Sequence, residues 1–302
     1  MIESRALHPL SLGDCAAIAI QLECSAEKLG NVHPSASFQD MNHTQFVIAS
    51  EAIGRRIDAL AEASTVGSIA LECVQAMIES AKTNTSLGTI LLFAPLSVAF
   101  RKLTKLEPSE VHDNTGFDSI QASLHFVLEA LTSQDSVMIY RAIQLAKPGG
   151  LGESQSMDVQ GEAPVCILDA MRHAATWDDI ALQYVTCFEL VFAIADRIRI
   201  KQSLYQNSLE AIRHVQLELL SERVDSLIAR KRGAAFAKQV QEWAKCVVGS
   251  GEYQSESFEA TWHELDEKLR NSSNGANPGT TADLIAGAIF VLNLSRVWSF
   301  PQ

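Results

Sequence analysis

The sequence predicts an all-α protein, a single globular domain of roughly ten to twelve helices that spans residues 1–302. Apolar residues recur at spacings of three and four over most of the chain, which is the period of an amphipathic helix. Sustained alternation of apolar and polar residues, the pattern of a half-buried strand, is absent from the sequence. The sequence also has no repeat of fixed period, so one domain is expected rather than a repeat array.

The order of the expected helices follows from caps and apolar spacing. Ser11 is a candidate cap of the first helix, a second helix runs from about Asn42, and a third follows Thr65. The windows 90–100 and 183–194 are apolar nearly all round, which predicts central, buried helices. After the third helix, and with these two windows included, the expected helices cover residues 84–101, 117–131, 134–147, 164–174, 178–203, 207–230, 233–248, 255–271 and 281–297.

Composition narrows the function classes. The chain has 24 Lys and Arg against 36 Asp and Glu, a formal net charge of −12, which argues against non-specific binding to nucleic acid or to anionic membranes. Its 6 cysteines form no Cys-x-x-Cys pair and are expected to be buried free thiols in a reducing compartment. We therefore expect a cytoplasmic protein with small-molecule ligands and no nucleic-acid or membrane partner. The oligomeric state is left open, with a homodimer as one option.

A glycine-dense loop is the first candidate site. Gly149, Gly150 and Gly152 lie within four residues, between two expected helices. Glycine allows backbone conformations, and a close approach of a ligand to the main chain, that other residues prevent. Glu153 follows directly and places a carboxylate at the edge of the loop. The alternative interpretation of the same loop is a simple turn.

A second candidate site follows the first helix. Gly30 is expected near the end of that helix, and Asp40 or Asn42 is expected to start the next one. These residues are ordinary caps in one interpretation. In the other, Asp40 is a metal-binding or base carboxylate near His33 and Lys28.

A third candidate precedes the strongly apolar helix that starts near residue 84. Asn84, Thr85 and Gly88 lie where free N–H groups and the helix dipole favour an anion, so the segment is a candidate phosphate site. Asn84 and Thr85 can equally serve as helix caps, because one geometry suits both roles.

Two further segments bring acids close to cations or to a rigid turn. Asp225 and Arg230 are expected on one helix, where an acid and a cation can point into one cleft; solvated surface is the alternative. Residues 277–279 form a rigid Asn-Pro-Gly turn. Thr280 and Asp283 after it have the form of a capping box.

Isolated histidines and tryptophans are assigned to structure. His125, His173 and His214 lie in expected helices without metal-ligand spacing to one another. The tryptophans are more typical of packing than of a platform that stacks bases; they are Trp177, Trp243, Trp262 and Trp298.

These five segments, in their order along the chain, resemble the motif set of the triphosphoribosyl-dephospho-coenzyme A synthase family. The resemblance extends from about Glu23 to Phe290. The matching parts of the chain are Glu23 with 28–32, Asp40-Met41, 84–88, 149–153, 225–230 and 278–284. Leu151 stands where the family pattern has arginine, and Ser86 and Leu87 stand where it has histidine and lysine.

The resemblance implies an all-helical transferase that moves a triphosphoribosyl group from ATP to 3′-dephospho-coenzyme A, with release of adenine, for prosthetic-group biosynthesis. Two alternatives remain open. One is a related enzyme that builds another phosphoribose-bearing cofactor of one-carbon metabolism, of the tetrahydromethanopterin or methanofuran type. The other is a non-catalytic helical module that binds nucleotides.

The chemistry of such a transfer assigns the expected roles. Displacing a base from ribose develops positive charge at the anomeric carbon, which one carboxylate can stabilise while another takes the proton of the attacking hydroxyl. The expected catalytic residues are Glu153, Asp40 and Glu23, and Asp225 and Asp283 are expected to hold Mg²⁺. The residues expected to contact ATP and the CoA-type substrate are Lys28, Gly30, Asn84, Thr85, Gly88, Gly149, Gly150, Gly152, Arg230, Asn277 and Gly279.

Overall fold

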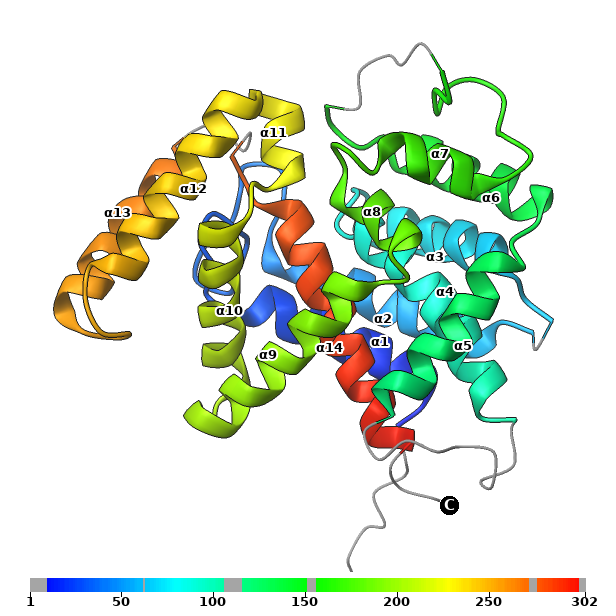
Figure 1. Ribbon diagram of the computed structural model, residues 1–302, viewed down its shortest axis with the longest axis horizontal. Helices are drawn as coiled ribbons and strands as arrows, with labels where there is room; N and C mark the ends of the chain where they lie inside the picture. Colours follow the sequence, from blue (N-terminus) through cyan, green and yellow to red (C-terminus); the bar gives the residue numbers. More distant parts are fainter. Residues whose placement is uncertain (1–9, 62, 106–115, 151–155, 272–275, 299–302) are drawn as a thin grey trace, which may run out of the picture.

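The described part of the chain consists of helices joined by loops, with no β-strand (Figure 1). The computed structural model describes residues 10–61, 63–105, 116–150, 156–271 and 276–298. Its helices, in chain order, are α1 (Leu12–Ser25), α2 (His43–Ala59), α3 (Val66–Ala81), α4 (Leu87–Leu103), α5 (Phe117–Glu129), α6 (Ser133–Ala146), α7 (Ile167–Ala174), α8 (Asp179–Val185), α9 (Glu189–Tyr205), α10 (Ser208–Glu222), α11 (Ser226–Arg232), α12 (Ala234–Gly249), α13 (Glu256–Arg270) and α14 (Gly279–Trp298). The expected all-α class is confirmed.

The long helix α14 lies at the centre of the fold, between the α1–α8 half and the α9–α13 half of the molecule (Figure 1). It packs against α1, α4, α9 and α10, and its residues 284–294 are buried. By length and apolar composition α14 could cross a membrane, but 83% of its most apolar window is buried inside the protein. Neighbouring helices therefore cover the apolar surface of α14, as they do around a core helix.

Two hydrophobic clusters hold the helices together. The main cluster includes buried residues of α1–α10 and α14. The second joins α10 and α11 to the helix pair α12–α13, around Phe258, Trp262 and Leu269. Figure 1 shows α12 and α13 side by side at one end of the molecule. Because α8 belongs to the main cluster and α11 to the second, a site between these two helices lies where the two clusters meet.

Local capping fixes the start of the first three helices. Ser11, Asn42 and Thr65 are their N-caps, and each side chain accepts a hydrogen bond from the third residue of its helix. In each case the third residue bonds back to the N-cap N–H, so two free donors are satisfied at once. The starts expected at Ser11, Asn42 and Thr65 are confirmed.

Two of the expected helices are each divided in two. The range 178–203 is interrupted between α8 and α9, where Cys187 and Phe188 adopt left-handed backbone with φ of 51° and 61°. The range 207–230 is interrupted before α11, whose N-cap is Asp225. The described residues therefore contain more helices than the ten to twelve expected, because neither break is marked by proline or glycine and apolar spacing continues across both.

The cysteines are free thiols, but not all of them are buried. Cys15, Cys24 and Cys73 lie in the core, and burial raises the pKa of each thiol to about 12. Cys246 is exposed on α12. The expectation of buried thiols is therefore wrong for Cys246, because its helix turns that face to solvent.

Helices α1 and α2 meet at two glycines, which gives a test of the packing. A Cβ on Gly13 would overlap the carbonyl oxygen of Gly54 and lie 2.5 Å from Asp58 Oδ2. We predict that Gly13→Ala lowers the free energy of unfolding by about 1–3 kcal/mol, because the helices must move apart. Urea denaturation measures the change.

Gly249 provides the control, since it also lies in the terminal turn of a helix and a Cβ there would meet nothing within 4 Å. Gly249→Ala is expected to leave the stability unchanged or to raise it by up to about 1 kcal/mol. Equal stability of the two variants would contradict the close contact of α1 and α2.

Candidate functional site

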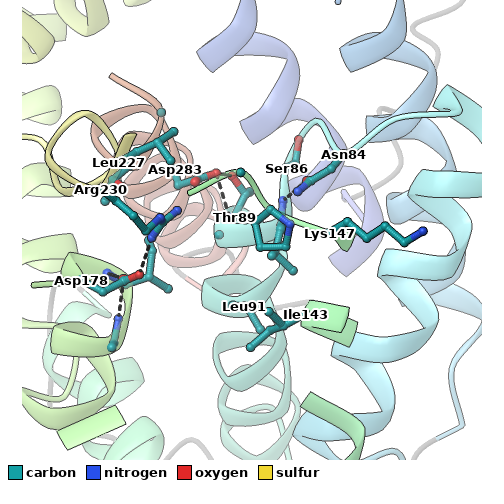
Figure 2. A pocket seen from close by; sticks show the side chains of 18 of the residues that line it. Asn84, Ser86, Thr89, Leu91, Ile143, Lys147, Asp178, Leu227, Arg230 and Asp283 are labelled. Atoms are coloured by element: carbon teal, nitrogen blue, oxygen red, sulfur yellow. Dashed lines mark hydrogen bonds and ion pairs between the residues drawn. The ribbon is translucent and has the colours of Figure 1, made fainter. Parts of the chain in front are cut away.

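A cavity of about 530 Å³ lies between the starts of α4 and α14, the helices α6–α8, and α11 (Figure 2). Segments far apart in the sequence line it, as the resemblance implies. The predicted site residues that line it are Glu23, Asp40, Asn84, Thr85, Gly88, Gly149, Arg230, Asn277, Gly279 and Asp283. The structure thus brings most of the predicted residues to one place.

The loop after α1 contains two of the predicted site residues, Lys28 and Gly30. Helix α1 ends at Ser25, earlier than expected, so Gly30 lies in the loop with a left-handed φ of 65°. The Lys28 ammonium group is fully buried and pairs with Glu23 at 2.9 Å. Neither Lys28 nor Gly30 lines the cavity, so contact with a substrate stays a prediction for both. In the structure Lys28 holds Glu23 in the wall.

The glycine loop reaches the cavity at its first glycine. Gly149 lines the cavity, and Gly150 has a left-handed φ of 77°, where a side chain would be strained. A Cβ on Gly150 would lie 3.2 Å from the Lys231 side chain, so the loop packs closely against α11. Gly152 and Glu153 lie outside the described residues. Their contacts, and the catalytic role of Glu153, stay predictions.

The N-termini of α4, α8, α11 and α14 line the same cavity. Asp178 caps α8, Asp225 caps α11, and Asp283 accepts a hydrogen bond from the N–H of Thr89 in the first turn of α4. Helix N-termini carry partial positive charge, which these carboxylates partly offset. Their convergence favours a negatively charged ligand at this side of the cavity.

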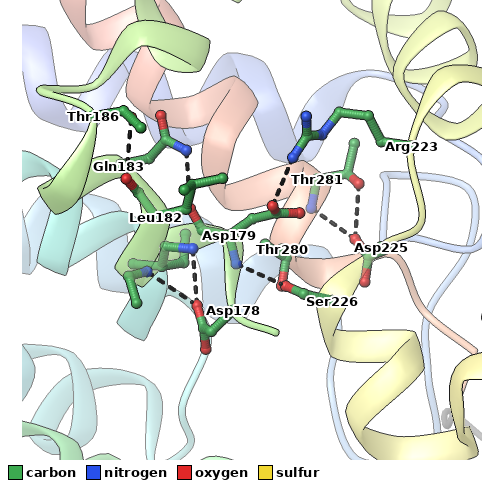
Figure 3. A network of polar contacts seen from close by, with 12 residues as sticks. Asp178, Asp179, Leu182, Gln183, Thr186, Arg223, Asp225, Ser226, Thr280 and Thr281 are labelled. Atoms are coloured by element: carbon green, nitrogen blue, oxygen red, sulfur yellow. Dashed lines mark hydrogen bonds and ion pairs between the residues drawn. The ribbon is translucent and has the colours of Figure 1, made fainter. Parts of the chain in front are cut away.

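A polar network ties three of these helix starts together (Figure 3). The Ser226 hydroxyl accepts a hydrogen bond from the Asp179 N–H at 3.3 Å and donates one to Thr280 Oγ1 at 3.0 Å. Asp225 Oδ2 accepts hydrogen bonds from both the N–H and the hydroxyl of Thr281, at 2.8 and 2.7 Å. The starts of α8, α11 and α14 are therefore held in a fixed relation to one another.

Both carboxylate oxygens of Asp225 accept hydrogen bonds within this network. Its Oδ1 accepts the N–H of Ile228, its Oδ2 is bonded to Thr281, and the residue is 4% exposed. It does not line the cavity. Its expected role as a metal ligand stays a prediction, while the contacts in the structure make it a positioning residue for α11 and α14.

The start of α14 differs from the expected capping box. The helix begins at Gly279, so Thr280 lies inside its first turn rather than before it. The Thr280 hydroxyl bonds to Ser226, and Asp283 turns toward Thr89. The capping-box prediction is wrong because both side chains bond to neighbouring helices instead of to each other's backbone.

Asp283 crosses from α14 to the start of α4 (Figure 2). Its Oδ1 accepts hydrogen bonds from the N–H and the hydroxyl of Thr89, at 2.9 and 2.6 Å. A Cβ on Gly88 would lie 2.7 Å from the Asp283 carboxyl carbon, so this approach requires glycine at position 88. Burial, reinforced by the charges of Glu23 and Asp225, raises the pKa of Asp283 to about 7 against the opposing effect of the Thr89 hydrogen bonds.

The carboxylates that line the cavity are suited to bind a metal ion together with the phosphate group of a ligand. Within the described residues, no group of three or more His, Cys, Asp and Glu could hold a metal ion by itself. Mg²⁺ is commonly bound by one or two carboxylates, with phosphates and waters as its other ligands. Glu23 and Asp283 line the same cavity, and the charge of Glu23 raises the cost of ionising Asp283, a cost that a bound cation would relieve. The donor set therefore suits Mg²⁺ carried by a nucleotide.

Cations reach the cavity from two sides. Arg230 pairs with Asp178 at 2.9 Å (Figure 2), and its Nε is buried without a partner among the described residues. Lys231 donates to Asn277 Oδ1 at 3.2 Å, and burial together with the nearby Arg230 lowers its pKa. Lys147 lines the cavity at the end of α6. Of these three cations only Arg230 was predicted from the sequence; Lys147 and Lys231 were detectable only by their position beside the glycine loop and Arg230.

The remaining part of the cavity is apolar. Helices α6, α7 and α8 contribute Ile143, Met171 and Ile180 to its wall. Trp177, between α7 and α8, also lines the cavity and is 51% exposed. Its ring contacts that of His173 edge to face, with centroids 5.0 Å apart. The cavity thus combines a charged region with an apolar, aromatic one.

Comparison with known proteins agrees with this geometry. The family model described as ATP:dephospho-CoA triphosphoribosyl transferase matches residues 9–301. A crystal structure from Archaeoglobus fulgidus, provisionally described as a triphosphoribosyl-dephospho-coA synthase, is similar with a TM-score of 0.60 and 24% identity, over 81% of this chain and 96% of that chain. At that identity the likeness concerns the fold. No curated protein matches the sequence.

The raised pKa of Asp283 gives a test of the cavity wall. The native protein holds a proton up to about pH 7 that the unfolded chain releases near pH 4, so wild-type stability falls as the pH rises between these values. Asn at this position keeps an oxygen for Thr89 and carries no charge. We predict that Asp283→Asn becomes more stable relative to wild type as the pH rises from 4 to 7, by up to about 4 kcal/mol.

Urea denaturation in the presence of a chelator, repeated at several pH values, measures this difference. It should reach a plateau above pH 7, once Asp283 is ionised in both states. A difference that does not change with pH would show that Asp283 ionises like an exposed carboxyl group.

Proposed function

The chain belongs to the ATP:dephospho-CoA triphosphoribosyl transferase family, and from this premise we propose that it transfers the triphosphoribosyl group of ATP to 3′-dephospho-coenzyme A with release of adenine. The bond between the anomeric carbon and adenine breaks, and a bond from that carbon to an acceptor ribose hydroxyl forms. The proton of the hydroxyl passes to a base. The observation that carries the proposal is the convergence of the family's segments on one cavity with both anionic and cationic side chains.

The charged region of the cavity suits the triphosphate. A triphosphate needs several positive contacts, and charge-assisted hydrogen bonds from Arg are the strongest available. Arg230, Lys231 and Lys147 supply cations in a chain that has Leu151 and Leu87 where the family pattern has Arg and Lys. The chain therefore keeps the capacity to bind a triphosphate, with part of its positive charge provided from other positions.

The carboxylates of the cavity divide into two groups by position. Asp283 bonds to the first turn of α4, and Glu23, whose charge acts on Asp283, lines the same cavity. These two would hold Mg²⁺, which neutralises phosphate oxygens and orients the triphosphate when bound. Asp40, in the loop before α2, lines the cavity separately. We assign Asp40 to accept the proton of the acceptor hydroxyl and Glu153 to stabilise positive charge at the anomeric carbon.

The structure supports an enzyme over a binding module that lost its chemistry. Glu23, Asp40 and Asp283 face the same cavity as Arg230, and a module that only binds nucleotides has no need of three carboxylates beside the phosphates. We place the reaction in the cytoplasm, because free cysteines persist in reducing compartments.

The proposed activity is tested by incubating the purified protein with ATP, Mg²⁺ and 3′-dephospho-coenzyme A and separating the products by chromatography. Free adenine is expected in equal amount to a dephospho-coenzyme A product that is heavier by one triphosphoribosyl group. ATP that remains intact, or adenine released without a modified acceptor, would contradict the transfer.

Arg230 gives a sharper test of triphosphate binding. Removing its charge deletes a charge-assisted contact to phosphate, which is worth about 1.5–3 kcal/mol. We predict that Arg230→Gln lowers kcat/KM for ATP by roughly 10- to 150-fold. The thermal unfolding of the variant should be checked, because Asp178 loses its ion-pair partner.

Arg232→Gln is the matched control. It removes the same charge two residues later in α11, from a side chain that lies over the Phe236 ring and does not line the cavity. Its kcat/KM is expected to stay within a factor of two or three of wild type, since a charge at that distance is screened. Equal losses of kcat/KM in both variants would mean that the net charge of the protein, and not the Arg230 contact, determines how well ATP is used.

A further inference from the structure

Trp177 is a large aromatic residue left open in the wall of the cavity. It is 51% exposed, whereas the lining residues Met171 and Ile180 are buried. Aromatic rings contribute more apolar surface than other side chains, so leaving one uncovered in a concave site is unfavourable unless a ligand covers it. The exposure of Trp177 inside the cavity therefore points to a ligand group.

The surroundings of Trp177 fix the ring. The His173 and Trp177 rings are perpendicular, with centroids 5.0 Å apart, and His173 Nε2 lies 3.3 Å from the Ser156 hydroxyl. A perpendicular contact on one side covers at most one face of the indole. The backbone is fixed as well, because Trp177 donates its N–H to the Ala174 carbonyl and the next residue, Asp178, caps α8. A ring held in place by these contacts, and half exposed, can act as a stacking surface that loses little entropy on binding.

The position of Trp177 relative to the cations defines the chemical class of the ligand. Asp178, the next residue in the chain, pairs with Arg230 at 2.9 Å. Lys231 follows Arg230 and lines the same cavity. A ligand that covers Trp177 and also reaches Arg230 has a flat, largely apolar group joined to an anionic group. A purine nucleoside triphosphate has this form.

We propose that Trp177 is the platform on which the adenine of the donor ATP stacks, with the triphosphate directed toward Arg230 and Lys231. The proposal rests on the proposed function and adds a residue that determines how the leaving base is held. The donor is chosen over the acceptor because Asp178, the residue after Trp177, pairs with Arg230, and the triphosphate is the part of either substrate that most needs such cations. Trp177 is thus a positioning residue for the bond that breaks.

The experiment compares Trp177→Ala and Trp177→Phe with a control, Phe126→Ala, by calorimetric titration with Mg²⁺-ATP, inorganic tripolyphosphate and dephospho-coenzyme A. Phe126 is 66% exposed on α5 and does not line the cavity. Base stacking on an aromatic side chain typically corresponds to an affinity change of roughly 5- to 150-fold. Trp177→Ala is expected to weaken ATP binding within this range and to leave tripolyphosphate binding unchanged. Trp177→Phe should restore most of the ATP affinity, and Phe126→Ala should match wild type.

The outcomes separate this inference from the proposed function. If wild type releases adenine and Trp177→Ala binds ATP as tightly as wild type, the platform is wrong and the function stands. If Trp177→Ala weakens dephospho-coenzyme A alone, the assignment to the donor is overturned. If wild type neither binds ATP nor releases adenine, the function is wrong and the platform with it. Far-ultraviolet circular dichroism confirms folding, which an exposed residue should not affect.

Discussion

The site depends on hydrogen bonds between helices, in which an aspartate of one helix accepts from the first turn of another. Asp225 of α11 accepts hydrogen bonds from the first turn of α14, and Asp283 of α14 accepts them from the first turn of α4. Each buried carboxylate is balanced by N–H donors and by the partial positive charge of a helix start. The bonds also join α11, which belongs to the second cluster, to α14 and α4 of the main cluster. The cavity lies at the place where they meet, with helix N-termini and the cations Lys147, Arg230 and Lys231 in its lining.

The chemistry of the cavity follows from this arrangement. The helix starts and Arg230 favour phosphate, while Glu23 and Asp283 lie where a metal bound to that phosphate would reach them. Helices α7 and α8 close the other side with apolar surface and with Trp177. On the proposed function, Asp283, whose raised pKa lowers the stability of the free protein near pH 7, would gain a favourable partner when a cation and the nucleotide bind together. Binding sites commonly lower the stability of the ligand-free protein in this way.

Local patterns in the sequence predicted the helices well and the site in part. Ser11, Asn42 and Thr65 start helices through contacts within four residues, so the chain itself carries the signal. Asp283 and Thr89 are 194 residues apart, and no local rule relates them. The break before α11 has no proline or glycine, so Asp225 was predicted inside a helix. Lys147, Lys231 and Trp177 come together at the cavity only when distant helices pack. This explains why the sequence did not mark the two lysines and assigned Trp177 to packing.

The most direct measurement is a crystal structure of the protein grown with Mg²⁺ and ATP in the absence of acceptor. We expect the triphosphate between Arg230 and the start of α4, the metal against Asp283 and Glu23, and the adenine over the Trp177 ring. ATP bound outside this cavity, or bound within it with the phosphates against the apolar residues Ile143, Met171 and Ile180, would contradict the site.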